Sequence, residues 1–233
     1  MADFVEHQPC EECGSSDGKA VYSDDSTYCF VCESHTKAGG TATSIQKKAK
    51  DFTPYRGEYM DLVDRKLFEK SLRHFGYQLG HDASGTPCHI APFYDAKGTL
   101  VAQKIRKPGK QFSVNGNLDK AGLFGENLWK SGKRLVITEG ELDAIAYAQA
   151  TGLSWQVVSV PNGAQGAAKS IKRSLEFVES FEDVVFLFDN DEPGEKAARE
   201  CAELLPPGKA RIAQLPLKDA SDMVVAGRAK ELK

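Results

Sequence analysis

Short apolar runs alternate with helix-like stretches in the second half of the chain. The apolar runs have the length of buried strands and cover residues 134–138, 156–160, 184–188 and 210–215. The helix-like stretches lie at about 140–151, 167–180, 193–204 and 222–233. Short buried strands that alternate with helices are typical of a parallel sheet with helices on its faces. The pattern therefore predicts an α/β subdomain over residues 134–233, built on a mainly parallel sheet.

Residues 52–133 show a different pattern. Residues 89–94 and 99–107 alternate like strands on either side of a short turn, which predicts a β-hairpin. Upstream, a helix is expected that Asp64 caps and Gly76 ends. The apolar residues of this helix would be Leu67, Phe68, Leu72 and Phe75. We therefore expect a mixed α+β subdomain before the parallel sheet.

The N-terminal residues 1–36 are set apart by composition and charge. Residues 37–51 are rich in Gly, Ser, Thr and Lys and lack a sustained apolar period, which indicates a flexible linker. Residues 1–36 carry eight acidic residues and one lysine, whereas residues 102–134 carry eight basic and two acidic residues. The total net charge of −3 hides this segregation, and it argues against a uniformly basic polyanion binder.

Two Cys-x2-Cys pairs, fifteen residues apart, lie in this acidic segment: Cys10, Cys13, Cys29 and Cys32. The spacing is typical of a zinc ribbon with four thiolate ligands. About 36 residues bury too little apolar surface to fold alone, so we expect one structural Zn²⁺ to stabilise residues 1–36. A redox pair or a disulfide framework fits a single Cys-x2-Cys unit better than this double pair.

The start of the chain has neither the basic nor the apolar segment of a signal peptide. We therefore expect a reducing compartment, in which disulfides are the weaker interpretation. No apolar run approaches the ~20 residues of a membrane span, so no membrane partner is expected. Cys88 and Cys201 are expected to be small buried hydrophobic residues.

Acidic residues follow three of the predicted parallel strands: Glu139 and Asp143 after the first, Asp189 and Asp191 after the third, and Asp219 after the last. Because the carboxyl ends of parallel strands meet at one edge of a sheet, we expect these carboxylates to converge. Hard oxygen ligands at this density suit Mg²⁺ or Mn²⁺. Taken alone, Asp143 or Asp219 would be read as an ordinary helix cap.

A basic strand precedes the acidic residues. Lys104 and Arg106 lie two apart and therefore share one face of the strand, and Lys110 follows just beyond Pro108 and Gly109. These cations are expected to contact phosphate groups, and the alternative is a solvated charged strand. Three nearby aromatic residues could stack bases, although core packing is the expected role for each: Phe93, Tyr94 and Phe112.

The motif Glu-Gly-x-x-Asp at 139–143, the Asp-x-Asp at 189–191 and the strand–helix alternation resemble the Toprim domain of primases, some topoisomerases and certain nucleases. Over residues 10–222 the chain resembles more closely the primase half of the primase-helicases of T7-like bacteriophages. This closer resemblance rests on the four-cysteine ribbon, 103–106, 122–125 with Leu128 and Trp129, and 218–220.

The resemblance implies a Toprim-type DNA primase, a nucleotidyltransferase that makes short RNA primers on single-stranded DNA during phage replication. It implies that Glu139, Asp143, Asp189, Asp191 and Asp219 hold or orient two Mg²⁺ or Mn²⁺ ions, with Glu139, Asp189, Asp191 and Asp219 as ligands. Lys104, Arg106 and Lys110 would contact the nucleotide or the template.

The implied substrates and partners are the DNA template, ribonucleoside triphosphates, a replication polymerase and a replicative helicase, fused or separate, in the cytoplasm of the host bacterium. No Gly-x4-Gly-Lys-Ser/Thr phosphate loop occurs in the 233 residues, so we expect no helicase half within them. Two other functions compete: a Toprim nuclease or topoisomerase fragment, and a non-catalytic recombination mediator that only binds DNA.

The zinc ribbon is expected to recognise the template. Residues 19–23 and 26–30 are predicted to form a hairpin with Asp24 and Asp25 at its tip. A carboxylate accepts a hydrogen bond from the amino group of cytosine, so Asp24 or Asp25 is a candidate base reader, with Ser26 and Tyr28 beside them. The alternative is that both aspartates are ordinary turn residues.

Overall fold

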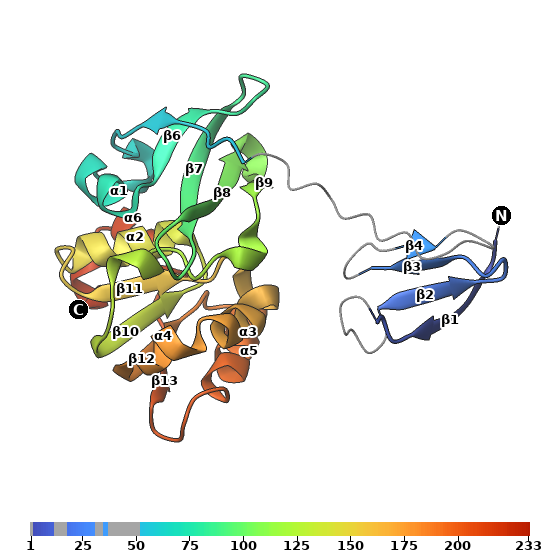
Figure 1. Cartoon of the computed structure of the whole chain (residues 1–233). Helices are drawn as coiled ribbons and strands as arrows, with labels where there is room; N and C mark the ends of the chain where they lie inside the picture. The colour runs from blue at the N-terminus through green and yellow to red at the C-terminus, as the bar shows by residue number, and fades with distance from the viewer. Residues whose placement is uncertain (1, 12–17, 31–34, 37–51) are drawn as a thin grey trace. The chain divides into compact units, whose positions relative to one another are not determined.

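The computed structural model describes residues 2–11, 18–30, 35–36 and 52–233. The chain divides into two compact units, Met1–Asp51 and Phe52–Lys233 (Figure 1). The predicted linker 37–51, together with Cys13 and Cys32, lies outside the described residues. The division into ribbon, linker and two catalytic subdomains therefore stays a prediction, and each unit is described by itself.

The N-terminal unit contains a four-stranded antiparallel sheet in the order β1-β2-β3-β4. Its strands are β1 (Phe4–Gln8), β2 (Lys19–Tyr22), β3 (Thr27–Cys29) and β4 (His35–Thr36). The predicted hairpin is confirmed as β2–β3, with Val21 opposite Thr27. In its turn, Asp25 has a φ of 61°, and Asp24 Oδ1 accepts a hydrogen bond from Ser26 N at 3.0 Å.

The second unit begins with a five-stranded antiparallel sheet in the order β5-β6-β7-β8-β9. Its strands are β5 (Gly57–Glu58), β6 (Gln78–His81), β7 (Pro87–Tyr94), β8 (Leu100–Lys107) and β9 (Gln111–Gly116). The β7–β8 hairpin confirms the predicted one. Asp95 Oδ1 accepts hydrogen bonds from the N–H groups of Lys97 and Thr99, and Gly98 takes the left-handed conformation at φ 78° that closes the turn.

The first helix starts later than predicted. Helix α1 covers Glu69–Phe75, whereas Asp64 lies in the short 3₁₀ turn Val63–Arg65 and caps no α-helix. A backbone bridge between Leu62 and Leu67 closes that turn, and Asp61 Oδ1 accepts the hydrogen bond from Glu69 N at 2.6 Å. Phe68 is exposed rather than packed. The end of the helix at Gly76, with φ 70°, is as predicted.

The predicted parallel sheet is confirmed, with four strands in the order β11-β10-β12-β13. The strands are β10 (Gly132–Thr138), β11 (Gln156–Ser159), β12 (Phe181–Leu187) and β13 (Ala210–Ile212). The helices are α2 (Glu141–Ala150), α3 (Gly163–Arg173), α4 (Leu175–Glu179), α5 (Glu192–Ala202) and α6 (Ala220–Val225).

Two predicted helices are each divided in the structure. The stretch 167–180 forms α3 and α4 on either side of Ser174. The stretch 222–233 forms α6 and a 3₁₀ helix, Ala229–Leu232, and Gly227 between them has a φ of 76° that a continuing α-helix does not allow. These divisions shorten the helices but leave the layer order unchanged.

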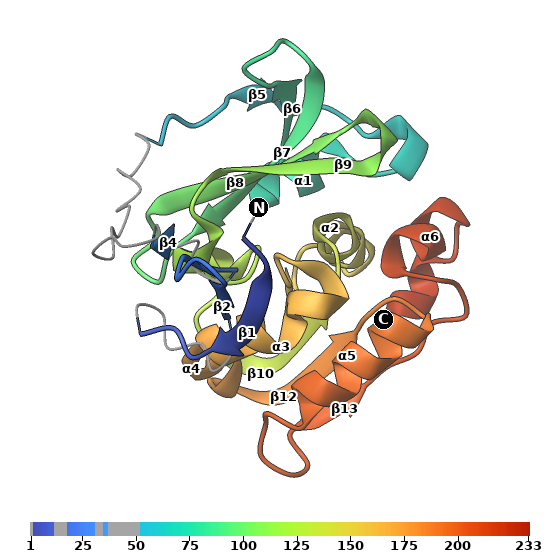
Figure 2. The same cartoon turned by 90° about the vertical axis from the view of Figure 1, so that its right-hand side faces the viewer.

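The two sheets of the second unit share one core. Val136 on β10 packs with α2 and α6, which face the antiparallel sheet, whereas Leu135 and Ile137 pack with α3, α4 and α5 on the opposite face (Figure 2). Phe93 of the antiparallel sheet belongs to the same cluster as Val136 and is fully buried. Replacing such a buried phenylalanine with alanine lowers the free energy of unfolding by about 3–5 kcal/mol. Packing of this kind holds the two sheets together on either side of the cleft described next.

Candidate active site

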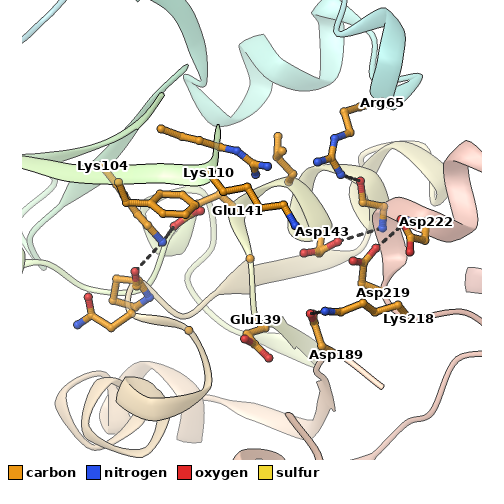
Figure 3. Close-up of a pocket in the computed structure, with 18 of the residues that line it drawn as sticks. Arg65, Lys104, Lys110, Glu139, Glu141, Asp143, Asp189, Lys218, Asp219 and Asp222 are labelled. Atoms are coloured by element: carbon orange, nitrogen blue, oxygen red, sulfur yellow. Dashed lines mark hydrogen bonds and ion pairs between the residues drawn. The ribbon is translucent and has the colours of Figure 1, made fainter. Parts of the chain in front are cut away.

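A cleft of the second unit, about 640 Å³ in volume, brings acidic and basic side chains together. It lies between the carboxyl edge of the parallel sheet and strands β8 and β9 (Figure 3). One side is the acidic edge, defined here as Glu139, Asp143, Asp189 and Asp219. The other side is the basic wall, defined here as Lys104, Arg106 and Lys110. The structure thus brings together all of the predicted site residues of this unit except Asp191, which adjoins the cleft through Lys218.

The parallel topology positions the acidic edge. Glu139 directly follows β10, Asp189 follows β12, and Asp219 is the residue that caps α6. Asp143 lies in the first turn of α2. One carboxylate oxygen from each of Asp143, Asp189 and Asp219 lies within 4.8 Å of the others, a separation that one cation can bridge. The predicted convergence of carboxylates is therefore confirmed for these three.

Backbone N–H groups fix two of these carboxylates. Asp219 Oδ1 accepts from Asp222 N at 2.7 Å, and Asp143 Oδ1 accepts from Ser221 N at 3.0 Å. Asp219 is therefore a helix cap and a member of the cluster at the same time. Helix α6 begins where Asp143 and Asp219 meet, so the cap orients the cluster.

Among the described residues, the charge of the acidic edge is compensated only at Asp189, which pairs with Lys218. Burial raises the pKa of Asp143 well above its usual range, and the neighbouring Asp219 adds to this. Burial, followed by the charge of Asp189, also raises the pKa of Glu139. Glu139 Oε2 is buried and has no hydrogen-bond partner among the described residues. Partly buried carboxylates with raised pKa values and an unsatisfied oxygen fit a site for divalent cations.

Asp191 is placed differently from the other acidic residues. Its Oδ1 accepts from Gly194 N at 3.0 Å and so caps α5, and this hydrogen bond is the main reason that its pKa is lowered. Its Oδ2 lies 3.2 Å from Lys218 Nζ, which also lies 3.3 Å from Asp189 Oδ2. Lys218 was not among the predicted site residues, although its position beside Asp219 after the last strand could have indicated it.

Lys104 of the basic wall already has partners. Its Nζ donates to Glu141 Oε1 at 2.8 Å and to the carbonyl of Pro161 at 2.9 Å. The Lys104 and Glu141 side chains are only 17% and 11% exposed, so this ion pair is largely withdrawn from water. Glu141 was not a predicted site residue, because its partner lies 37 positions away in the other subdomain.

Phe112 corrects another expectation. It is 53% exposed and lines the cleft, so it is not a core residue, whereas Phe93 is fully buried as expected. The centre of its ring lies 5.2 Å from Lys104 Nζ and 5.7 Å from the Arg106 guanidinium carbon. Phe112 lies opposite Arg106 in the β8–β9 register, and β9 is the edge strand of its sheet, which leaves the ring exposed at the cleft.

A partly buried polar pair lies next to the basic wall. The Tyr77 hydroxyl and His89 Nδ1 are 3.0 Å apart, and His89 pairs with Arg106 across the β7–β8 hairpin. Burial is the main cause that lowers the pKa of His89, and the positive charge of Arg106 adds to it. His89 is therefore held neutral beside Arg106.

Two family models match the second unit. One is described as the N-terminal α+β fold of the bacteriophage T7 DNA helicase/primase and matches residues 57–116, and the other, described as Toprim-like, matches residues 136–224. The DNA helicase/primase of Enterobacteria phage T3 is 35% identical over 242 residues, which cover 98% of this chain and 43% of the relative. The crystal structure of the primase fragment of the bacteriophage T7 primase-helicase is 34% identical, covers 98% of both chains and has a TM-score of 0.73.

The chain belongs to the T7-type helicase/primase family.

The family membership identifies the second unit as a Toprim-type primase fold and supports a DNA primase function. This chain spans less than half of the length of the T3 helicase/primase. A further structure contains the T7 lagging-strand DNA polymerase with primase domains bound to an RNA/DNA hybrid and dTTP, and the chain matched there is 36% identical, with a TM-score of 0.71, over 76% of this chain and 89% of that one. No helix in the described ranges has the length and hydrophobicity of a membrane span.

Two of the four predicted zinc ligands, Cys10 and Cys29, lie in the described part of the N-terminal unit. Cys10 and Cys29 are both buried. Gln8 pairs with Lys19, and Lys19 pairs with Cys29, so Cys29 and the end of β1 that leads to Cys10 lie at the same end of the sheet. Two buried cysteines at one end of this sheet fit a thiolate site, and the complete four-cysteine site stays a prediction.

The candidate base readers fall into two groups. Hydrogen bonds from Ser26 lower the pKa of Asp24, whose carboxylate is thus engaged within the turn. Tyr28 instead belongs to a chain of ring contacts, with centroids 5.0–6.5 Å apart, that runs through Tyr22, Phe4, His7, Phe30 and Tyr28. Phe4 and Phe30 in this chain are exposed. The hairpin therefore presents aromatic rings as well as carboxylates.

Proposed function

We propose that this chain is a DNA primase that joins ribonucleoside triphosphates into short RNA primers on a single-stranded DNA template during phage replication. The observation that carries the proposal is the convergence of Asp143, Asp189 and Asp219 at one edge of a cleft whose other side is basic. The cleft, about 640 Å³ in volume, presents carboxylates that could hold metal ions on one side and cations that could hold phosphates on the other.

The acidic edge would perform the chemistry of nucleotidyl transfer. Divalent ions held by Glu139, Asp189, Asp191 and Asp219 would lower the pKa of the attacking 3′-hydroxyl and neutralise the triphosphate and the leaving pyrophosphate. Asp143, partly buried and fixed by Ser221 N, would orient the set rather than act as a ligand. The cap at Asp219 keeps one of its oxygens on the backbone of α6 and leaves the other for the cluster.

The basic wall would hold phosphate groups of the template or the nucleotide. Arg106 and Lys110 line the cleft and have no carboxylate partner among the described residues, so their charge is available to phosphate. Lys104 is neutralised by Glu141, so it would act mainly by its fixed position and its hydrogen bonds. Contacts of this kind position a strand and do not specify its sequence.

The N-terminal unit would read template bases. Residues 1–36 are too acidic to gain affinity from the phosphate backbone. Base stacking on aromatic side chains contributes about 1–3 kcal/mol per base and does not depend on charge. The ring chain that includes Tyr28 would supply such stacking, and Asp24, Asp25 and Ser26 at the hairpin tip would supply hydrogen bonds.

A structural Zn²⁺ on Cys10, Cys13, Cys29 and Cys32 would stabilise this unit. Removing it with a chelator should abolish initiation at preferred template sites and leave residues 52–233 folded, because that unit has its own core. Circular dichroism and primer synthesis on mixed templates measure the two effects. Cooperative unfolding of the whole chain on chelation would contradict the two-unit division.

The partners proposed for this chain are a replication polymerase and a replicative helicase, fused or separate, in the cytoplasm of the host bacterium. Support comes from the T7 structure in which a lagging-strand polymerase interacts with primase domains, and from the fused helicase of the T3 relative.

Ribonucleotide incorporation tests the proposed function against its alternatives. The full chain is incubated with a single-stranded DNA that contains every trinucleotide, labelled ribonucleoside triphosphates and Mg²⁺, and the products are separated on a gel. Short template-dependent RNA supports a primase. Cleaved DNA would indicate a Toprim nuclease, relaxed supercoils in a parallel assay would indicate a topoisomerase, and DNA binding without synthesis would indicate a mediator.

A further inference from the structure

Lys218 bridges two carboxylates, one in the acidic edge and one that caps α5. Its Nζ lies 3.3 Å from Asp189 Oδ2, in the acidic edge (Figure 3). It also lies 3.2 Å from Asp191 Oδ2, at the cap of α5. Asp189 therefore belongs both to the cluster with Asp143 and Asp219 and to a pair with Asp191 that a lysine bridges. Lys218 pairs with both members of the second group and contacts the first group only through Asp189.

The backbone of Lys218 is hydrogen-bonded to the loop that contains Asp189 and Asp191, the two carboxylates its side chain contacts. Asn190, which lies between the two bridged aspartates, donates its backbone N–H to the carbonyl of Lys218 at 2.7 Å. The Asn190 side chain donates to the carbonyl of Leu215 at 3.2 Å, and this second bond ties the same two loops together. The next residue after Lys218 is Asp219, whose side chain caps α6. Lys218 is thus attached on both sides to the carboxylate scaffold, unlike a lysine on an open surface.

We propose that the Lys218 ammonium is a built-in counter-cation of the Asp189–Asp191 pair, and that a divalent ion binds this pair only by displacing it. Before nucleotide arrives, divalent ions would bind at the acidic edge and not at the Asp189–Asp191 pair. A nucleoside triphosphate with a bound divalent ion would bring the second metal ion to the Asp189–Asp191 pair. The displaced Lys218 ammonium would then pair with the triphosphate. The inference rests on the proposed metal-dependent reaction and adds a positioning residue to it.

The physical reason is competition for the same oxygens. A Mg²⁺ or Mn²⁺ ion needs carboxylate lone pairs at about 2.0–2.2 Å, and the two Oδ2 atoms already accept from one ammonium. Like charges this close repel each other strongly at a partly buried site. Lys218 is 54% exposed, so its side chain has room to swing away once a competing cation and a phosphate are present.

The test counts Mn²⁺ ions on the nucleotide-free full chain by electron paramagnetic resonance and calorimetry. Replacing the ammonium with a neutral side chain of similar length, Lys218→Met, should add one ion or strengthen the weakest bound ion by about tenfold or more, as expected for loss of one nearby positive charge. Lys218→Arg keeps the charge and should restore the wild-type count. In the double variant Lys218→Met with Asp191→Asn, the gained ion should be lost again, because its second ligand is gone.

Lys196→Met is the matched control, since Lys196 pairs with Glu200 on α5 and does not line the cleft. It should bind Mn²⁺ as the wild type does. If Lys218→Met gives the wild-type count and affinities, or if neither protein binds Mn²⁺, the proposal is overturned. Thermal unfolding checks that each variant is folded, and Lys218→Gln serves as the second neutral variant if Lys218→Met is not.

Primer synthesis by the wild type is measured separately, so the two ideas can fail independently. A wild type that makes primers while Lys218→Met binds no extra or tighter ion removes the role of Lys218 and keeps the primase. A Lys218→Met variant that gains an ion while the wild type makes no primers keeps the counter-cation and removes the proposed function.

Discussion

The acidic edge and the basic wall face each other across one cleft, but their charges are compensated in different ways. The acidic edge is held by backbone N–H groups at helix starts, which orient Asp143 and Asp219 but do not neutralise them. The basic wall is held by side chains: Glu141 neutralises Lys104, and the ring of Phe112 lies against Lys104 and Arg106.

This difference explains why the acidic edge, and not the basic wall, depends on an added metal ion. Asp143, Asp189 and Asp219 have oxygens within 4.8 Å of one another and repel each other, and Lys218 offsets only the charge of Asp189, so the acidic edge gains from a bound metal ion. The basic wall is already near electrical balance at Lys104, so it depends less on a ligand for its stability. Substitutions on the two sides should therefore change different properties: catalysis on one side, and stability or phosphate affinity on the other.

The largest effect is expected on the acidic edge. Asp189→Asn or Glu139→Gln should reduce primer synthesis by more than about a hundredfold, since even residues that only support metal ligands are commonly worth 10–100-fold. The amides keep the shape of the side chains, so circular dichroism should show an unchanged fold. Near wild-type primer yield from either variant would remove that residue from the reaction.

The next effect is on stability and concerns the basic wall. Lys104→Met leaves Glu141 as a nearly buried, unpaired carboxylate and should lower the free energy of unfolding by about 2 kcal/mol. The double variant Lys104→Met with Glu141→Leu should recover most of this loss, because no buried charge remains. Urea unfolding measures both, with Lys97→Met in the exposed β7–β8 turn as the control. An equal loss in the single and double variants would show that the ion pair is not what stabilises this wall.

A smaller effect is expected at Lys110. Lys110→Ala should lower the magnitude of the salt dependence of template binding by about 0.7 in the log–log slope, the contribution of one contact to single-stranded phosphate. Preference among template sequences should not change, since phosphate contacts do not specify bases. Lys120→Ala, an exposed lysine outside the cleft lining, should leave the slope unchanged. A changed choice of start sites with an unchanged slope would mean that Lys110 reads bases.

The smallest effect concerns pH and lies next to the basic wall. Because the pKa of His89 is lowered in the folded protein, its contribution to stability is complete above the ordinary histidine pKa of 6.5 and is lost as the pH falls through the lowered pKa. The free energy of unfolding should therefore fall more steeply below pH 6.5 in the wild type than in His89→Gln. His74 also has a lowered pKa, so the difference between the two proteins is the quantity to compare. Parallel pH profiles would contradict the assignment.

Much of the acidic edge was predictable because it depends on local order along the chain. A short apolar run followed at once by Glu139, or by Asp189, places a carboxylate at a strand end, and parallel topology then brings the strand ends together. The position of Asp219 as both cap and cluster member also follows from its place after the last strand.

The rest depends on contacts that no local pattern encodes. The pairing of Lys104 with Glu141 and the bridging by Lys218 require the docking of separate segments. The exposure of Phe112 depends on β9 being the edge strand, which the alternation of residues cannot show. At the first helix, the carboxylate that receives the N–H of Glu69 belongs to Asp61 rather than Asp64, because the Leu62–Leu67 bridge inserts a turn between them.

The central claim is that the acidic edge performs catalysis and the basic wall binds the template. Steady-state primer synthesis by Asp189→Asn and Lys110→Ala, measured side by side at varied template concentration, tests it most directly. The account predicts that Asp189→Asn lowers kcat with little change in the KM for template, and that Lys110→Ala raises this KM with kcat largely retained. A variant of the acidic edge that changes only KM, or a variant of the basic wall that loses kcat as completely as Asp189→Asn does, would contradict it.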